Sequence, residues 1–230
     1  MLFRILADFG KPILTTFVFF SLSALLSLCL AVVFCFASRA ETALVRCTAH
    51  VLIEVSRGVP TVVFILLMGN LGMSPVFGFF ETLGSLPGTP SGFTAMAIFV
   101  FLGLAFSSAG HMSKIIDAGL STINQNLLDY LFTLKYTWVS LTWLLFVEAM
   151  PALIQPLFAR LTHHLHNTAF ISLFPITGIF AAMRKGVDET ALVGLYVSVA
   201  TILFVLIGEA ISILGRMIQN FSSRAVIVDR

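Results

Sequence analysis

Residues 13–38 form an apolar run that contains no charged side chain. A helix needs roughly 20 predominantly apolar residues to cross about 30 Å of hydrocarbon, because each backbone N–H and C=O must be paired internally where water is absent. The run therefore predicts a membrane-spanning helix. It is too long for a signal-peptide core and no plain small-x-small cleavage site follows it, so we expect a retained span.

The composition of the whole chain agrees with a membrane protein. Of 230 residues, 58% are hydrophobic and only 10% are charged, and the mean hydropathy is +1.02. These values exclude a soluble enzyme and a disordered region. A formal net charge of +2 is too small for a basic nucleic-acid module, so no nucleic-acid partner is expected. The predicted fold class is an all-α integral membrane protein.

The same length criterion gives four further candidate spans, for about five transmembrane helices in all. They lie at about 59–73, 91–112, 143–161 and 191–214. Pro151 and Pro156 lie inside the fourth, and we expect them to break or kink its helix.

The loops indicate which end of each span faces the cytoplasm. Residues 74–90 contain several Gly and Pro, the single acid Glu81 and no Lys or Arg, which favours the non-cytoplasmic side. With five spans, the N-terminus is then outside and the C-terminus inside. Of the thirteen Lys and Arg, eight fall inside and five outside, Arg160 among the latter. This is a modest positive-inside bias.

No internal repeat or low-complexity tract divides the chain, so we expect one membrane domain. Residues 1–12 are predicted to be an N-terminal amphipathic segment. Residues 13–218 would form the transmembrane domain, with a cytoplasmic loop at 113–142, and residues 219–230 a cytoplasmic tail.

Few side chains suggest catalysis or metal binding. The three cysteines have no CxxC spacing, so neither a disulfide framework nor a zinc site is predicted. His163 and His166 could share a helix face beside His164, but no acid or thiol lies within a few residues to complete a metal site. No nucleotide-binding, hydrolase or zinc-protease motif occurs. We therefore predict no metal, no cofactor and no enzymatic activity, with a membrane enzyme that uses these histidines as an alternative.

Three ionisable residues lie within or beside the predicted spans. Glu148, Arg160 and Glu209 are candidates for a transport pathway or for interhelical packing, because charged groups are costly in the membrane.

The second span begins with the segment Glu54-Val-Ser-Arg57-Gly58-Val-Pro60. Glu54 and Arg57 are three residues apart and share a helix face, while Gly58 and Pro60 give a close-approach or kink point. The segment resembles E-x-x-R-G-T-P-L, which opens the second span in the permease subunits of bacterial ABC importers for polar amino acids.

The segment from Ser108 to Ile123 is similar to the same family's S-G-A-Y-x-A-E-x-x-R-G-G-I-x-S-I. Lys114 stands where the family has Glu, and Asp117 where it has Arg. The two charges are exchanged but remain opposite and three residues apart, so we expect the pair to be retained with its polarity reversed.

The family's coupling signature, E-A-A-x-x-L-G-L-S, aligns with the segment from Asp129 to Thr137. The resemblance implies that Asp129, Leu134 and Lys135 contact an ATPase subunit, with Asp129 in place of the Glu and Lys135 in place of the Gly. The small residues of the motif are replaced by Tyr130 and Leu131, which makes this loop a degenerate version.

Two further segments follow the family's order. Gln155-Pro156-Leu157 resembles P-P-L, and the segment from His166 to Phe170 resembles K-D-T-S-L, with Thr168 retained and His166 and Asn167 in place of Lys and Asp. We place His166, Asn167 and Thr168 among the pathway or packing candidates. The resemblance extends over about residues 13–215.

The resemblance implies an ABC importer permease-like bundle in a bacterial inner membrane, which translocates a polar amino acid or similar small solute. Its implied partners are an ABC ATPase subunit, a second permease copy or paralogue, a periplasmic solute-binding protein and membrane lipid. One alternative is a diverged, non-coupling half of a heteromeric transporter. Another is a structural membrane protein without transport activity.

Overall fold

The computed structural model describes residues 2–84, 86–124 and 138–228, and in these residues the chain is all-α, as predicted. Among these described residues, three helices are long and apolar enough to cross a membrane: α1 (Leu2–Ala37), α4 (Thr94–Leu120) and α8 (Val193–Val228). The pair α2 (Ala43–Gly58) and α3 (Thr61–Gly72) makes a fourth if it counts as one bent span. The chain is thus a multi-pass membrane protein, whereas the predicted count of five spans is not established.

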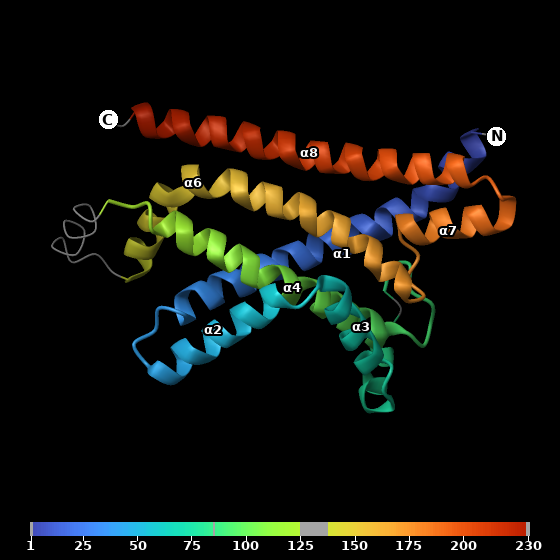
Figure 1. The fold of residues 1–230 in the computed structure, drawn as a ribbon, viewed down its shortest axis with the longest axis horizontal. Coiled ribbons are helices and arrows are strands. Elements are labelled where there is room, and N and C mark those ends of the chain that lie inside the picture. The colour runs from blue at the N-terminus through green and yellow to red at the C-terminus, as the bar shows by residue number, and fades with distance from the viewer. Residues whose placement is uncertain (1, 85, 125–137, 229–230) are drawn as a thin grey trace.

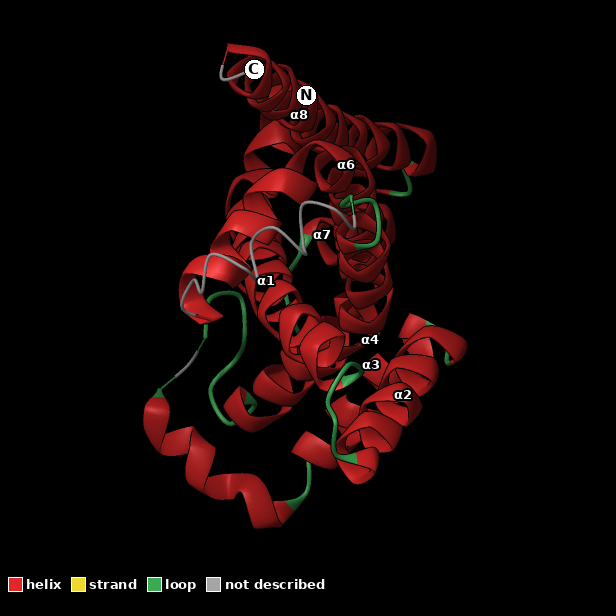
Figure 2. Cartoon of the chain, turned by 90° about the vertical axis from the view of Figure 1, so that its left-hand side faces the viewer, coloured by secondary structure: helices red, strands yellow, loops and turns green. Residues whose placement is uncertain are grey.

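α6 (Trp138–Asn167) and α8 run along the longest axis of the molecule, α1 and α4 cross near its middle, and the two termini lie at opposite ends of it (Figure 1). α4 is the central helix, because 72% of its most apolar window is buried against its neighbours. The corresponding share for α8 is only 17%. Seen from the side, α8 and the α2–α3 pair lie at opposite edges of the bundle (Figure 2). Much of the apolar surface of α8 is therefore left to lipid or to another chain.

The first helix begins at Leu2 and continues through Pro12, so the N-terminal segment and the first span form one rod. Its outer turns are held by α8, because the Tyr196 hydroxyl donates a hydrogen bond to Asp8 at 3.1 Å. The ring of Phe9 also packs on that of Tyr196, with centroids 6.1 Å apart. The short helix α7 (Ile179–Thr190) completes this end of the bundle.

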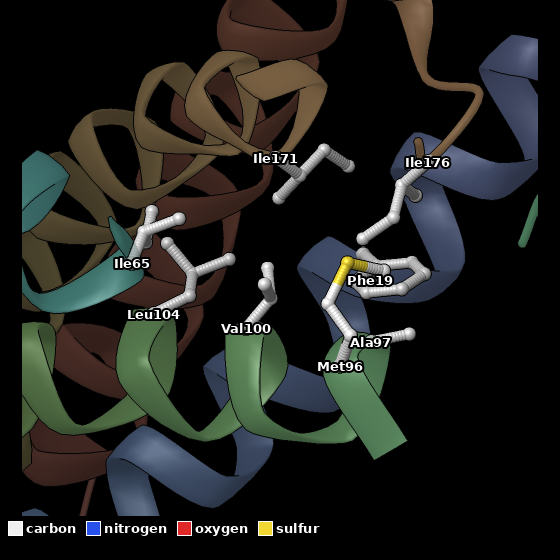
Figure 3. Packing of buried hydrophobic residues seen from close by; sticks show 8 residues of the cluster. All are labelled: Phe19, Ile65, Met96, Ala97, Val100, Leu104, Ile171 and Ile176. Carbon is white, nitrogen blue, oxygen red and sulfur yellow. The ribbon is translucent and has the colours of Figure 1, made fainter. Parts of the chain in front are cut away.

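One apolar cluster lies between α1, α3, α4 and the segment around η2 (Thr168–Leu173), a short 3-10 helix. Figure 3 shows how its side chains point toward one another from these elements. The buried members are Phe19, Ile65, Met96, Ala97, Val100, Leu104, Ile171 and Ile176. This cluster holds α1, α3 and α4 against one another.

The second span is broken. α2 ends at Gly58 and α3 begins at Thr61, and the two axes meet at 105°. Val59 and Pro60 are both extended, with ψ angles of 129° and 136°. Pro60 has no N–H to continue the helix, and its ring disfavours a helical conformation for Val59. The Val59-Pro60 pair therefore ends α2 and changes the direction of the chain before α3 begins.

The fourth predicted span corresponds to α6 (Trp138–Asn167), which continues through both Pro151 and Pro156. The break expected at these prolines does not occur. α6 packs along α4 and α8, so its neighbours stabilise helical backbone where proline removes two intrahelical hydrogen bonds.

The N-terminus of α4 is capped from a distant element. Glu81 lies in the 3-10 helix η1 (Pro75–Leu83), and its carboxylate accepts hydrogen bonds from the backbone N–H groups of Thr94 and Ala95, at 3.0 and 2.9 Å. These hydrogen bonds hold the pKa of the Glu81 carboxyl below its usual value. The negative charge also lies at the positive end of the helix dipole.

Candidate functional site

Four polar residues occupy one face of α6. Arg160, His163, His164 and Asn167 follow the i, i+3, i+4, i+7 spacing that places side chains along a single stripe of a helix. Their contacts reach three other helices. We call this set the polar band, together with its contact residues Ser23, Thr61 and Ser108 and with His111 of α4, which Arg160 and His163 influence electrostatically.

His164 lies at the centre of the polar band and is completely buried. Its Nδ1 is 2.6 Å from the Ser108 hydroxyl on α4, and its Nε2 is 2.8 Å from the Ser23 hydroxyl on α1. One imidazole thus joins three helices by hydrogen bonds.

The direction of these hydrogen bonds follows from the groups at either end. The Ser23 hydroxyl donates its proton to the Phe19 carbonyl at 2.5 Å, so its oxygen accepts from His164 Nε2–H. A neutral imidazole then accepts at Nδ1 from Ser108. The Ser108 oxygen in turn accepts from Arg160 Nη2 at 3.4 Å. The network assigns His164 the Nε2–H tautomer, in a one-way series that starts at a guanidinium and ends at a carbonyl.

Arg160 is partly buried and contacts the middle of α4, although the assignment of loops to sides counted it among the basic residues on the non-cytoplasmic side. Its hydrogen-bond partner Ser108 is about 20 Å from either end of α4, at 1.5 Å per residue. The guanidinium has two neutral partners: Ser108, and His163 Nδ1 at 3.4 Å from Nη1. Its Nε is buried without a hydrogen-bond partner.

The exposed edge of the polar band is made by His163. The Asn167 amide donates to the Thr61 hydroxyl at 3.3 Å and lies 3.4 Å from His163 Nδ1. Because the Arg160 guanidinium and the Asn167 Nδ2 amino group can only donate, His163 Nδ1 accepts from both, and the ring proton of a neutral imidazole is then on Nε2. Thr61 is the first residue of α3, so the polar band reaches the elbow of the broken span.

The charges around the polar band are positive. The charged or titratable groups that influence His111 on α4 are Arg160, Arg57 and His163. Glu54 is an acid close to this set in sequence, and it already pairs with Arg57 at 3.1 Å, as the sequence predicted. Arg160 therefore has no acidic partner within the described residues.

The other predicted pathway or packing residues lie apart from the polar band. Thr168 is buried and donates to the Leu165 carbonyl at 2.6 Å. His166 is exposed and packs against Phe204 of α8, with ring centroids 6.3 Å apart. Glu209 is 3.9 Å from Arg216 at the exposed surface of α8, and Glu148 is exposed on α6.

The side chains of His163, His164 and His166 therefore lie in different environments. His163 faces the exposed edge, His164 the interior and His166 the helix α8. In the part of the chain that the structure describes, no three His, Cys, Asp or Glu side chains come together in a way that could hold a metal ion.

The charge pair expected between Lys114 and Asp117 is wrong. Asp117 instead accepts hydrogen bonds from Arg39, at 3.0 Å from Nε and 2.7 Å from Nη2. Arg39 follows the last turn of α1 and also reaches the Asp117 carbonyl at 3.3 Å. The Arg39 guanidinium donates to Asp117 from two nitrogens, so it takes the place of Lys114 as the partner of this carboxylate. The predicted coupling residues Asp129, Leu134 and Lys135 lie outside the described residues.

Four members of the polar band were not singled out from the sequence: Ser23, Thr61, Ser108 and His111. Each lies within or beside an apolar run, and three of the four are serine or threonine, which are common there. The available signal was the polar stripe from Arg160 to Asn167, since a polar face on a membrane helix requires polar partners on its neighbours. That stripe does not say which helices supply them.

Comparison with known proteins gives similarity at the level of structure. No family model matches the sequence, and no curated protein matches it. The solved structure of an amino acid ABC transporter with histidines is similar with a TM-score of 0.75 and 16% identity, over 95% of this chain and 96% of that chain. The MetNI methionine ABC transporter in inward-facing conformations gives 0.68 and 15%, over 96% and 97%. At these identities the likeness concerns the fold, and the chain has the fold of an ABC importer permease.

Proposed function

We propose that this chain is the transmembrane permease subunit of an ABC importer, and that it moves a polar amino acid or a similar small solute across a bacterial inner membrane. The observation that carries the proposal is the likeness to a solved amino acid ABC transporter over 95% of the chain, with a TM-score of 0.75. Likeness of fold alone is an analogy for function, so the polar band supplies the local support.

Polar side chains within a membrane domain are costly unless they face other polar groups or an aqueous route. The polar band lies about half-way along α4 and has an exposed edge at His163. A second permease copy or paralogue related by a two-fold axis would present its own band, and the two could line a route that one bundle cannot enclose.

The energy for transport would come from a separate ABC ATPase subunit. It would bind the segment 113–142, with Asp129, Leu134 and Lys135 as coupling residues, and its closure on ATP would rock the bundles between inward-open and outward-open states. The kink formed by Gly58 and Pro60, together with the Glu54–Arg57 pair, would shape the start of the second span. A periplasmic solute-binding protein would deliver the solute to the opposite side.

The degenerate coupling segment keeps the diverged, non-coupling half-transporter as the second candidate. Bulky Tyr130 and Leu131 replace the small residues of the family's motif, so a partner permease would make the main ATPase contact. The membrane-enzyme alternative loses support because the three histidines diverge into separate surroundings.

Purification of the tagged chain in mild detergent, followed by mass spectrometry of its partners, tests the proposal. We expect an ATP-binding chain in the complex. The double variant Asp129→Ala/Lys135→Ala should release that chain and abolish uptake if this subunit couples directly. The matched double variant Asp188→Ala/Lys185→Ala, on exposed positions of α7, should do neither.

Absence of any ATP-binding partner would overturn the proposal. If the ATP-binding chain is present but the Asp129/Lys135 variant keeps both partner and uptake, direct coupling is wrong and the non-coupling half is favoured.

A further inference from the structure

We infer that the transported solute is a small carboxylate of net negative charge, and that its carboxylate pairs with Arg160 within the polar band. This inference rests on the proposed function, since it names the solute class of that same site.

Arg160 is a cation without a counter-charge. Arg57 has Glu54, and Arg39 has Asp117. Within the described residues, the printed partners of the Arg160 guanidinium are a serine hydroxyl and a histidine nitrogen, both at 3.4 Å, and its Nε–H is buried without a partner. A partly buried guanidinium with long, neutral contacts and an unpaired donor is costly. An anion would offset that cost.

The exposed edge of the polar band presents donors. His163 is exposed and its Nδ1 is occupied by Arg160 and Asn167, which leaves its Nε2–H as a further donor. The fixed charges that act on His111 are those of Arg160 and Arg57, and no acid is among the groups that influence it. An ammonium group would meet like charge here and find no carboxylate. A carboxylate would find a planar fork of N–H donors that matches its two oxygens.

The depth of the polar band selects between two sources of an anion. Ser108, which contacts Arg160, is about 20 Å from either end of α4. A phospholipid headgroup lies at the membrane surface and does not reach that depth. The anion is therefore a solute within the bundle.

Thermal stabilisation of the purified, ATP-hydrolysing complex tests this inference with probes of similar size and different charge. L-Glutamate and succinate are the anionic probes, L-glutamine is the neutral one and L-lysine the cationic one. We expect the anionic probes to stabilise the complex at concentrations at least tenfold below those of the other two, because a lost hydrogen bond to a charged group changes affinity by roughly that factor or more.

The variant Arg160→Gln should raise the half-saturating concentration of the anionic probes at least tenfold. Arg160→Lys should lie between the two, since it keeps the charge and loses the fork. The matched variant Arg184→Gln, at an exposed position of α7, should behave like the unmodified chain. The thermal unfolding of each variant is also measured without any probe, so that a folding defect in Arg160→Gln is recognised. If Arg160→Gln does not fold, the affinity of Arg160→Lys for the anionic probes tests the inference instead.

Preference for L-lysine or L-glutamine, or equal responses of the unmodified complex and both Arg160 variants, would overturn the inference. So would a complex that hydrolyses ATP and is stabilised by none of the anionic probes. In all these cases the proposed function stands, because the ATP-binding chain is still present. Loss of that chain from the unmodified preparation would instead refute the proposed function.

Discussion

Ser23 of α1 and Ser108 of α4 hydrogen-bond to opposite nitrogens of the same buried ring, that of His164, at 2.8 and 2.6 Å. Neither serine is charged, yet together they hold α6 against α1 and α4. A rocking motion of the bundle would therefore carry α1, α4 and α6 as one unit, unless this imidazole loses a partner.

Replacing His164 by Ala should destabilise the fold by about 2–4 kcal/mol, because the substitution leaves a cavity and two buried hydroxyl groups without their partner. Denaturant unfolding in detergent measures the difference. His50→Ala, an exposed histidine on α2, is the matched control and should change stability by less than about 0.5 kcal/mol. Equal effects of the two variants would show that His164 does not join the helices.

α4 and α2 approach closely at Gly110. A Cβ at this position would lie 2.7 Å from the Ile53 carbonyl oxygen and from the Ser56 hydroxyl. That hydroxyl also accepts from the Gly110 N–H at 2.9 Å. Gly110→Val should therefore separate the helices and cost about 1–3 kcal/mol.

The matched control is Gly194→Val on α8, where a Cβ meets nothing within 4 Å. Thermal unfolding of the two variants in the same detergent compares them. Gly110→Val unfolding at the temperature of the unmodified chain would contradict the close approach of α2 and α4.

The ion pair between Arg39 and Asp117 should contribute little to stability. The two side chains are 43% and 38% exposed, and exposed pairs are typically worth about 0.2–1 kcal/mol. A double-mutant cycle with Arg39→Ala and Asp117→Ala should give a coupling energy in that range. The cycle with Lys114→Ala and Asp117→Ala should give about zero, and a larger coupling for Lys114 would restore the local pair that the sequence predicted.

The Glu81 cap predicts an acid-sensitive start to α4. The pKa of Glu81 in the folded chain is lowered by the Ala95 and Thr94 N–H groups, so folding favours the ionised form. The stabilisation is complete above the unfolded pKa of about 4.3, and it is lost as the pH falls through the lower, folded-state pKa. Glu81→Gln should unfold at a lower temperature than the unmodified chain at pH 7.

Thermal unfolding of both chains between pH 7 and pH 3 should show their difference shrinking toward acid. Glu41→Gln, at an exposed carboxylate before α2, serves as the comparison and should show no such trend. A difference between the Glu81→Gln and unmodified chains that stays constant down to pH 3 would exclude a role for the charge in the cap.

The fold class could be read from hydropathy because the membrane criterion depends on composition within one segment at a time. The apolar run at 13–38 became α1 for that reason. The expected break in α6 was wrong, because Pro151 and Pro156 lie inside a continuous helix that is stabilised by its neighbours. A single-segment rule for proline does not include those neighbours.

The candidate site was predictable only in part. Arg160 and Asn167 were named from charge and resemblance, and the Glu54–Arg57 pair from i,i+3 spacing. Ser23 and Ser108 could not be named, because the network depends on which helices face α6. The same limit explains Asp117, whose partner Arg39 comes from the end of another helix rather than from its own.

The break between α2 and α3 at Pro60 restricts which groups can cover this part of the surface. Pro60 offers no N–H to the Ser56 carbonyl, which is its helical acceptor, and the turned backbone from Gly58 to Thr61 is partly open at the surface of this chain. Acyl chains cannot solvate such amide groups. Wherever acyl chains would meet this turn, protein or water must cover the elbow in their place.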